Sequence, residues 1–103
     1  MGYDVMHTAP AAQDFDGIIQ YTVSRLNNPA AASALLDEYE ERLANLRESP
    51  RFYGSARIER LARAGYHRFT FGNYIAFYKI NDKEKKVFIL RIFYQKQRYE
   101  NML

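Results

Sequence analysis

One stretch decides the fold class of this chain: His67-Arg68-Phe69-Thr70-Phe71-Gly72-Asn73-Tyr74-Ile75-Ala76-Phe77-Tyr78-Lys79-Ile80. Two runs rich in aromatic and β-branched residues, which strands prefer, flank a Gly-Asn pair of the kind that closes a tight hairpin. A polar turn at residues 81–85 leads into a third such run at residues 87–94. The C-terminal half therefore predicts an antiparallel β-meander.

Helical periodicity replaces this pattern on the N-terminal side. After a short predicted strand at residues 3–7, apolar residues recur at three- and four-residue spacing over residues 9–26, with Thr8 placed as the N-cap. The breaker Asn27-Asn28-Pro29 ends that helix, and a second amphipathic helix follows and stops before Pro50. The two helices are predicted to form an αα-hairpin.

Residues 51–65 hold little pattern beyond their arginines and predict a mostly irregular crossover, which could hold a short turn of helix or strand. The fold class is therefore α+β: an N-terminal strand, an αα-hairpin and a C-terminal antiparallel β-meander packed on the helices. A length of 103 residues, of which 48% are apolar and 26% charged, predicts one domain over residues 1–103.

Composition argues against several kinds of chemistry. The chain has no cysteine for a disulfide or a thiolate, and two lone histidines, His7 and His67, do not make an all-protein metal site. Neither a phosphate-binding glycine loop nor a Ser/His/Asp set can be assembled, so we expect no metal and no other cofactor. No apolar run reaches the roughly 18 residues of a membrane span, and the first residues lack the regions of a signal peptide. We therefore expect a cytoplasmic protein without membrane contact.

The net charge of +3 joins two unlike halves. Residues 1–50 carry three basic and eight acidic side chains, whereas residues 51–103 carry twelve basic and four acidic ones, which gives net charges of −5 and +8. Such an asymmetry steers polyanions toward one face and is typical of proteins that work on nucleic acid. An acidic protein partner and a merely solvated basic face are the alternatives.

The predicted strands at residues 74–80 and 87–94 are apolar on both faces. A sheet backed by helices on one side normally alternates apolar and polar residues, so something must cover the second face. We expect another chain to cover it; the alternative is that the termini and the crossover of the same chain do so.

Arg, Lys and Tyr side chains gather around the predicted sheet and are the candidate functional residues. Arginine and lysine stabilise phosphate charge and aromatic rings stack on unpaired bases, so the set suits metal-free work on single-stranded RNA. For each of them a plain surface charge is the alternative, and Arg91 could instead be a structural ion-pair residue. The candidates are Arg68, Lys79, Arg91, Tyr94, Lys96, Arg98 and Tyr99.

Nearly the whole chain resembles the RelE/ParE superfamily of type II toxins in element order, spacing and length. The resemblance rests on the following stretches: Thr-x-Pro-Ala-Ala-Gln-Asp-Phe-Asp-Gly-Ile-Ile-Gln-Tyr at residues 8–21, Gly65-Tyr66-His67-Arg68, Asn73-Tyr74-Ile75-Ala76-Phe77-Tyr78 and Ile89-Leu90-Arg91-Ile92-Phe93-Tyr94. It implies a toxin that is encoded beside a small antitoxin, whose segments would cover the basic and apolar sheet face.

The superfamily resemblance implies one of two mechanisms. RelE-like members cut mRNA on the ribosome by activating a 2′-hydroxyl against its own phosphate, and ParE-like members inhibit DNA gyrase without a nuclease set. A catalytic arginine of the nuclease branch would fall where this sequence has Ile75, which counts against cleavage. Tyr94 stands where nuclease members place a functional aromatic or imidazole group.

The sequence places ribosome-dependent mRNA cleavage first, because it supplies candidates for each catalytic role. Tyr94 would orient or deprotonate the 2′-hydroxyl and Arg91 and Arg98 would neutralise the phosphate, while the RNA- or target-binding residues would be Arg68, Lys79, Lys96 and Tyr99. Gyrase inhibition is the alternative, with the helical hairpin and the basic tail as contact elements. A third reading is an attenuated homologue that is kept for antitoxin binding.

Overall fold

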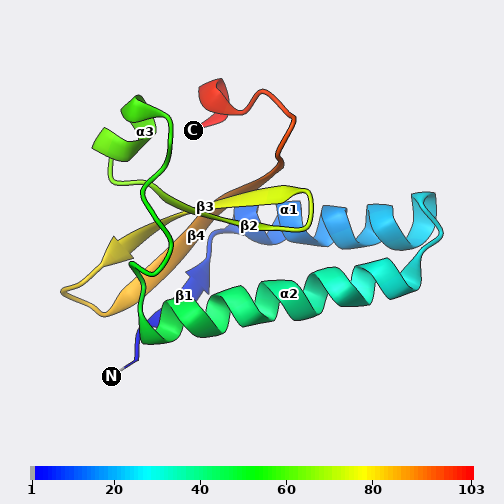
Figure 1. Ribbon diagram of the computed structural model, residues 1–103, viewed down its shortest axis with the longest axis horizontal. Helices are drawn as coiled ribbons and strands as arrows, with labels where there is room; N and C mark the ends of the chain where they lie inside the picture. Colours follow the sequence, from blue (N-terminus) through cyan, green and yellow to red (C-terminus); the bar gives the residue numbers. More distant parts are fainter. Residues whose placement is uncertain (1) are drawn as a thin grey trace.

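The computed structural model describes residues 2–103 and contains a four-stranded sheet with helices on both sides (Figure 1). Strand β1 and helix α1 come first, followed by α2, α3 and three further strands. Their bounds are β1 Asp4–His7, α1 Ala9–Gln20, α2 Pro29–Glu48, α3 Glu59–Arg63, β2 His67–Phe71, β3 Tyr74–Asn81 and β4 Lys86–Tyr94. A π-helical turn, η1, spans Tyr21–Arg25, and a 3₁₀ turn, η2, spans Glu100–Met102.

The sheet order is β1-β4-β3-β2. Strands β2, β3 and β4 form the predicted antiparallel meander, whereas β1 pairs in parallel with β4, from Asp4 beside Lys86 to His7 beside Ile89. The β2–β3 hairpin turns at Gly72, whose φ of 54° favours glycine and where a Cβ would meet Leu35 Cδ2 at 2.5 Å. The predicted fold class is confirmed.

Both helix starts follow from the local sequence. The Thr8 hydroxyl accepts a hydrogen bond from the Ala11 amide at 3.2 Å, and the Asn28 side chain accepts one from the Ala31 amide at 3.0 Å. The predicted helix over residues 9–26 is regular only to Gln20, where η1 takes over. The predicted irregular crossover holds one short helix, α3, and an isolated bridge between Ser55 and His67.

Helices α1 and α2 cover one face of the sheet, which we call the helix face, and α3 with the C-terminal residues lies on the second face (Figure 1). The helix-face core includes Tyr39, Leu46 and Tyr78. On the second face Ile75, Phe77 and Phe93 are buried under residues of the crossover, α3 and the C-terminal tail. The expectation that another chain must cover this face is therefore wrong, because the chain's own crossover and tail bury it.

A β-bulge decides which face each residue of β4 occupies. The register passes from Tyr78 opposite Ile89 to Phe77 opposite Arg91, which leaves Leu90 without a partner. Val87 and Ile89 therefore share the helix face with Ile92. Arg91 is shifted out of the helix-face core, toward the side of Phe93.

Candidate functional site

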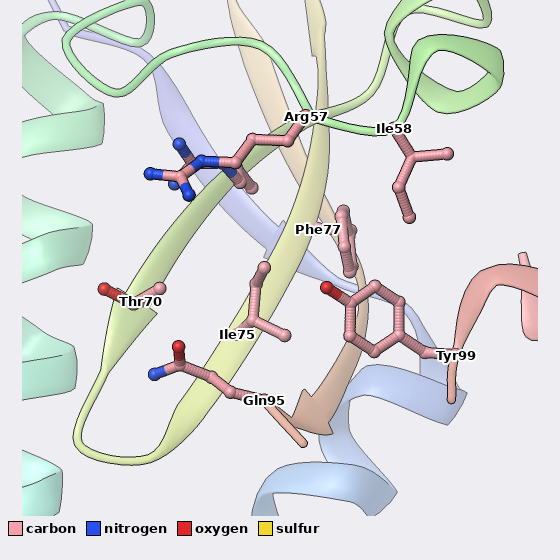
Figure 2. A pocket seen from close by; sticks show the side chains of 8 residues that line it. Arg57, Ile58, Thr70, Ile75, Phe77, Gln95 and Tyr99 are labelled. Carbon is pink, nitrogen blue, oxygen red and sulfur yellow. The ribbon is translucent and has the colours of Figure 1, made fainter. Parts of the chain in front are cut away.

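A pocket of about 320 Å³ opens on the second face of the sheet between the crossover, strands β2 and β3, and the tail (Figure 2). We call it the arginine pocket. Its floor is apolar, because Ile75 and Phe77 are buried there, and its polar groups come from all three surrounding segments. The lining residues are Arg57, Ile58, Arg68, Thr70, Ile75, Phe77, Gln95 and Tyr99.

Strand alternation brings Arg68 into this pocket. Arg68 lies opposite Phe77 and Thr70 lies opposite Ile75 in the β2–β3 ladder, so all four residues share the second face. The Nε atom of Arg68 is buried without a hydrogen-bond partner. Neither Arg57 nor Arg68 forms an ion pair within residues 2–103. Two positive groups therefore line one pocket that supplies no carboxylate.

Tyr99 closes the tail side of the pocket. Its ring stacks on Phe93 with the centroids 5.5 Å apart and an interplanar angle of 6°, and it also contacts Phe77 with the centroids 5.2 Å apart. These contacts hold the tail against the sheet. Of the predicted target-binding residues, the structure thus brings Arg68 and Tyr99 together in one site.

Lys79 and Arg91 are engaged elsewhere. The Lys79 ammonium lies 4.5 Å from the centroid of the Tyr66 ring, a cation–π contact. Arg91 Nε donates to Asp14 Oδ2 at 2.8 Å, and the same oxygen accepts the Ile92 amide at 2.9 Å. This hydrogen bond and the negative charge of Asp14 raise the pKa of the Arg91 guanidinium. The structure therefore favours the ion-pair interpretation of Arg91.

Tyr94 lies on the helix face, away from the arginine pocket. Its ring stands edge-on to the Tyr74 ring, with the centroids 5.9 Å apart, and Tyr94 is 42% exposed. It lines a separate groove of about 750 Å³, which we call the tyrosine groove. The groove's residues are Gln13, Asp14, Gly17, Ile18, Tyr21, Leu26, Asn73, Tyr74, Ile92, Phe93, Tyr94 and Gln97.

None of the three predicted catalytic residues lines the arginine pocket. Tyr94 belongs to the tyrosine groove, Arg91 binds Asp14, and Arg98 is an exposed residue of the tail, as is Lys96. The site also contains residues that the sequence did not single out, namely Arg57, Thr70 and Gln95. Thr70 could have been found from its two-residue spacing from Arg68 on one strand, whereas Arg57 lies in a segment without periodicity.

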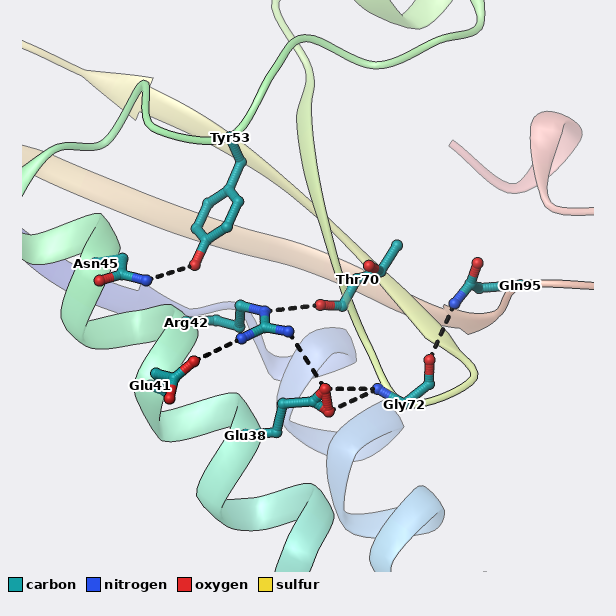
Figure 3. A network of polar contacts seen from close by, with 8 residues as sticks. All are labelled: Glu38, Glu41, Arg42, Asn45, Tyr53, Thr70, Gly72 and Gln95. Carbon is teal, nitrogen blue, oxygen red and sulfur yellow. Dashed lines mark hydrogen bonds and ion pairs between the residues drawn. The ribbon is translucent and has the colours of Figure 1, made fainter.

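A network of polar side chains from α2 covers the free edge of β2 beside this site (Figure 3). Arg42 Nε donates to the Thr70 carbonyl at 2.9 Å, and Glu38 accepts the Gly72 amide at 3.0 Å. Arg42 also pairs with Glu38 at 3.2 Å and Glu41 at 2.9 Å. These side chains satisfy backbone groups that an edge strand would otherwise expose.

Both histidines have a lowered pKa. Burial, and to a lesser degree the charge of Arg51, lowers the pKa of His67, whose Nδ1 is buried without a hydrogen-bond partner. Burial also lowers the pKa of His7, whose Nε2 lies 2.7 Å from the Tyr39 hydroxyl. The His7 ring packs against Tyr39 and the His67 ring packs against Tyr78, so both histidines are part of the packing around the sheet.

Residues 2–103 contain neither a metal-binding cluster nor a membrane-spanning helix. No group of three or more His, Asp or Glu side chains there is arranged to hold a metal ion. None of the helices in that range combines the length and apolar character that crossing a membrane requires.

Solved structures with this fold include several toxins. The toxin–antitoxin complex RelBE2 from Mycobacterium tuberculosis matches with a TM-score of 0.62 and 24% identity, over 91% of this chain and 99% of that one. The chromosomal ParDE system from P. aeruginosa matches with a TM-score of 0.66 and 22% identity, over 87% and 92%. A mutant of the E. coli toxin RelE in the free state matches with a TM-score of 0.64 and 15% identity, over 98% and 87%. At these identities the likeness establishes the fold.

The sequence itself identifies the family. A search of curated proteins found no match to the chain. The sequence model described as "ParE toxin of type II toxin-antitoxin system, parDE" matches residues 5–99, which is most of the chain. The chain therefore belongs to the ParE toxin family of type II toxin–antitoxin systems, within the RelE/ParE superfamily.

Proposed function

We propose that this toxin inhibits DNA gyrase by binding it, without cutting RNA, and that a cognate antitoxin holds it inactive. The observation that carries the proposal is that the predicted catalytic residues lie outside the arginine pocket and that one of them is held in an ion pair. Tyr94 lies in the tyrosine groove, Arg91 is bound to Asp14, and Ile75 forms the pocket floor where the nuclease branch would have an arginine. Without an arginine at position 75, a nuclease would lose roughly 3 kcal/mol of transition-state stabilisation unless another donor of the pocket replaced it.

The tyrosine groove supports a protein target. Tyr21 and Leu26 at the end of the helical hairpin are 50% and 54% exposed, and Tyr94 is exposed beside them. Exposed aromatic and aliphatic side chains that share a groove are typical of protein–protein interfaces. The hairpin is also the contact element that we expect from the sequence for a gyrase inhibitor.

Antitoxin binding is supported by the relatives. The M. tuberculosis RelBE2 structure is a toxin–antitoxin complex, and the P. aeruginosa structure is of a ParDE toxin–antitoxin system. We extend this partnership to the present chain because its family is defined by such systems.

Ribosome-dependent mRNA cleavage is the second candidate function. It is favoured by the arginine pocket, which Arg57 and Arg68, both without a carboxylate partner in residues 2–103, line together with Tyr99. Arginine and an aromatic ring together suit an unpaired nucleotide. In that case Arg57 and Arg68 would take over the role of the arginine that the nuclease branch has at the position of Ile75.

The two functions are separated by inducing the chain in bacteria without its antitoxin and following labelled thymidine and amino-acid incorporation over the first minutes. We expect DNA synthesis to fall first and the purified chain to inhibit supercoiling by gyrase. An early fall in protein synthesis, with mRNA cut on ribosomes, would favour the second candidate. Growth unaffected by induction would instead identify an attenuated homologue.

Tyr94→Phe provides the matched variant for this experiment. The substitution removes only the hydroxyl and keeps the ring against Tyr74, so the groove keeps its shape. If the chain acts on gyrase through the tyrosine groove, Tyr94→Phe keeps the ring in that surface and should weaken gyrase inhibition by no more than about fivefold, the effect of losing one hydrogen bond of roughly 1 kcal/mol. A nuclease that uses this hydroxyl in proton transfer should lose about 100-fold or more in cleavage rate.

A further inference from the structure

The arginine pocket contains positive charge that the described part of the chain does not neutralise. Arg42, Arg51, Arg63 and Arg91 each have a carboxylate partner. Arg57 and Arg68 share one pocket and have none within residues 2–103, and the buried Nε of Arg68 lacks an acceptor. Burying a donor without an acceptor is destabilising. The buried Nε of Arg68 is therefore available to an acceptor from outside the chain.

The chemistry of the lining defines that acceptor. A guanidinium group is planar and binds carboxylate or phosphate oxygens through paired donors. Ile75 and Phe77 form an apolar floor, against which a group that fills the pocket can place apolar surface next to its negative charge. Thr70 and Gln95 add a hydroxyl and an amide at the sides (Figure 2).

The neighbouring cations favour a single anionic group over a nucleic-acid backbone. Binding a phosphate chain requires a row of available positive charges, since its affinity comes from neutralising several phosphates. Lys79 is placed over the Tyr66 ring and Arg91 binds Asp14, so neither extends the row beyond the pocket. A volume of about 320 Å³ is sufficient for one or two side chains.

We infer that the arginine pocket binds an acidic side chain, together with an adjoining apolar side chain, of the cognate antitoxin. The inference rests on the proposed function only in requiring that the toxin has a protein antitoxin. Residues 51–103, which include every residue that lines the pocket, carry a net charge of +8 and attract an acidic segment. The paired arginines then fix where that segment is anchored.

The test is to measure the affinity of the purified chain for the product of the neighbouring antitoxin reading frame by titration calorimetry. Arg57→Ala with Arg68→Ala should weaken binding roughly 10- to 100-fold, because charge-assisted hydrogen bonds are lost. Arg47→Ala removes the same charge from an exposed position of α2 and should change the affinity less than about twofold. Arg68→Lys keeps the positive charge but loses the paired donors of the guanidinium group, so its affinity for the antitoxin should lie between those of the other two variants.

Salt dependence and folding complete the design. The double variant should lose affinity with added salt less steeply than the unmodified chain, since fewer charged contacts remain to be screened. Arg57 is exposed, so the single variant Arg57→Ala should fold normally. Its affinity for the antitoxin can therefore be measured even if the double variant folds poorly. An unchanged affinity in both variants would overturn the anchor.

Toxicity distinguishes this inference from the proposed function. If the anchor is right, the double variant should arrest growth without antitoxin and should escape rescue by co-expressed antitoxin. Unchanged rescue and affinity, combined with lost binding of a labelled single-stranded RNA, would overturn the anchor in favour of a nucleic-acid site. An unmodified chain that neither arrests growth nor binds the antitoxin would refute the proposed function, and the anchor with it.

Discussion

Replacing Asp14 with alanine tests how α1 is fastened to the sheet. Strand β1 accompanies β4 only as far as Ile89, so the backbone of β4 beyond that point lacks a strand partner on this side. Asp14 supplies the acceptor there: one carboxylate oxygen takes both the Ile92 amide at 2.9 Å and Arg91 Nε at 2.8 Å. Asp14→Ala removes both bonds at once.

The expected loss follows from three contributions. The Arg91–Asp14 side chains are 32% and 18% exposed, so their ion pair is worth about 1 kcal/mol after screening. The amide of buried Ile92 is left without an acceptor, which costs about 1 to 3 kcal/mol. Alanine returns about 0.5 kcal/mol through its helix propensity. The free energy of unfolding should therefore fall by about 1.5 to 3.5 kcal/mol, which lowers Tm by about 7 to 16 °C in a domain of this size.

Thermal and urea unfolding of the purified chain, followed by circular dichroism, measure this loss. Asp16→Ala is the matched control, because Asp16 is an exposed carboxylate on the same helix and should change stability by no more than about 0.5 kcal/mol. A double-mutant cycle with Arg91→Ala should give a coupling of about 1 kcal/mol between the two side chains. If Asp14→Ala is as stable as Asp16→Ala, the fastening described here is wrong and Arg91 is again available for another role.

Two further perturbations address the free edge of β2 and the dependence of stability on pH. Arg42→Ala leaves the Thr70 carbonyl uncovered, so the free energy of unfolding measured in urea should fall by about 1 to 2 kcal/mol and light scattering should show more self-association, whereas Arg47→Ala should change neither. Burial and the charge of Arg51 lower the pKa of His67 below its ordinary value of 6.5, so at mildly acidic pH the unfolded chain binds more protons than the folded chain. The neutral His67 ring therefore contributes stability that is fully present above about pH 6.5. This stability is lost as the pH falls through the lowered pKa. His67→Phe should therefore flatten part of the fall in Tm between pH 7 and pH 5, and an unchanged profile would show that His67 does not titrate differently on folding.

The sequence predicted those parts of the fold that depend on interactions between residues close together in the chain. Gly72-Asn73 encodes the hairpin because the turn needs a residue with positive φ, and Thr8 encodes a helix start because its hydroxyl reaches the Ala11 amide. The parallel pairing of β1 with β4 joins residues about 80 positions apart in the chain, as in the pair Val5 and Val87. No local pattern specifies such a partner, so the pairing could not be predicted.

The candidate site was only partly predictable because of the bulge in β4. Simple alternation from Val87 and Ile89 would put Arg91 on the helix face, yet the unpaired Leu90 shifts the phase by one residue. Ile92 then takes the core position, and the next residues of β4 follow the shifted phase, with Tyr94 beside Tyr74. Arg91 and Tyr94 are three positions apart, so alternation alone places them on opposite faces, and the bulge decides which face each of them takes.

The arginine pocket and the tyrosine groove are separated by a single sheet, because Tyr74 lines the groove and its neighbour Ile75 lines the pocket. A partner anchored in the pocket therefore does not by that contact cover the groove. The shortest connection runs around the end of β4, where Gln95 lines the pocket and Gln97 lines the groove. If the toxin acts through the groove, an antitoxin anchored at Arg57 and Arg68 must continue past this segment in order to neutralise it, so binding and neutralisation are separable properties of the antitoxin.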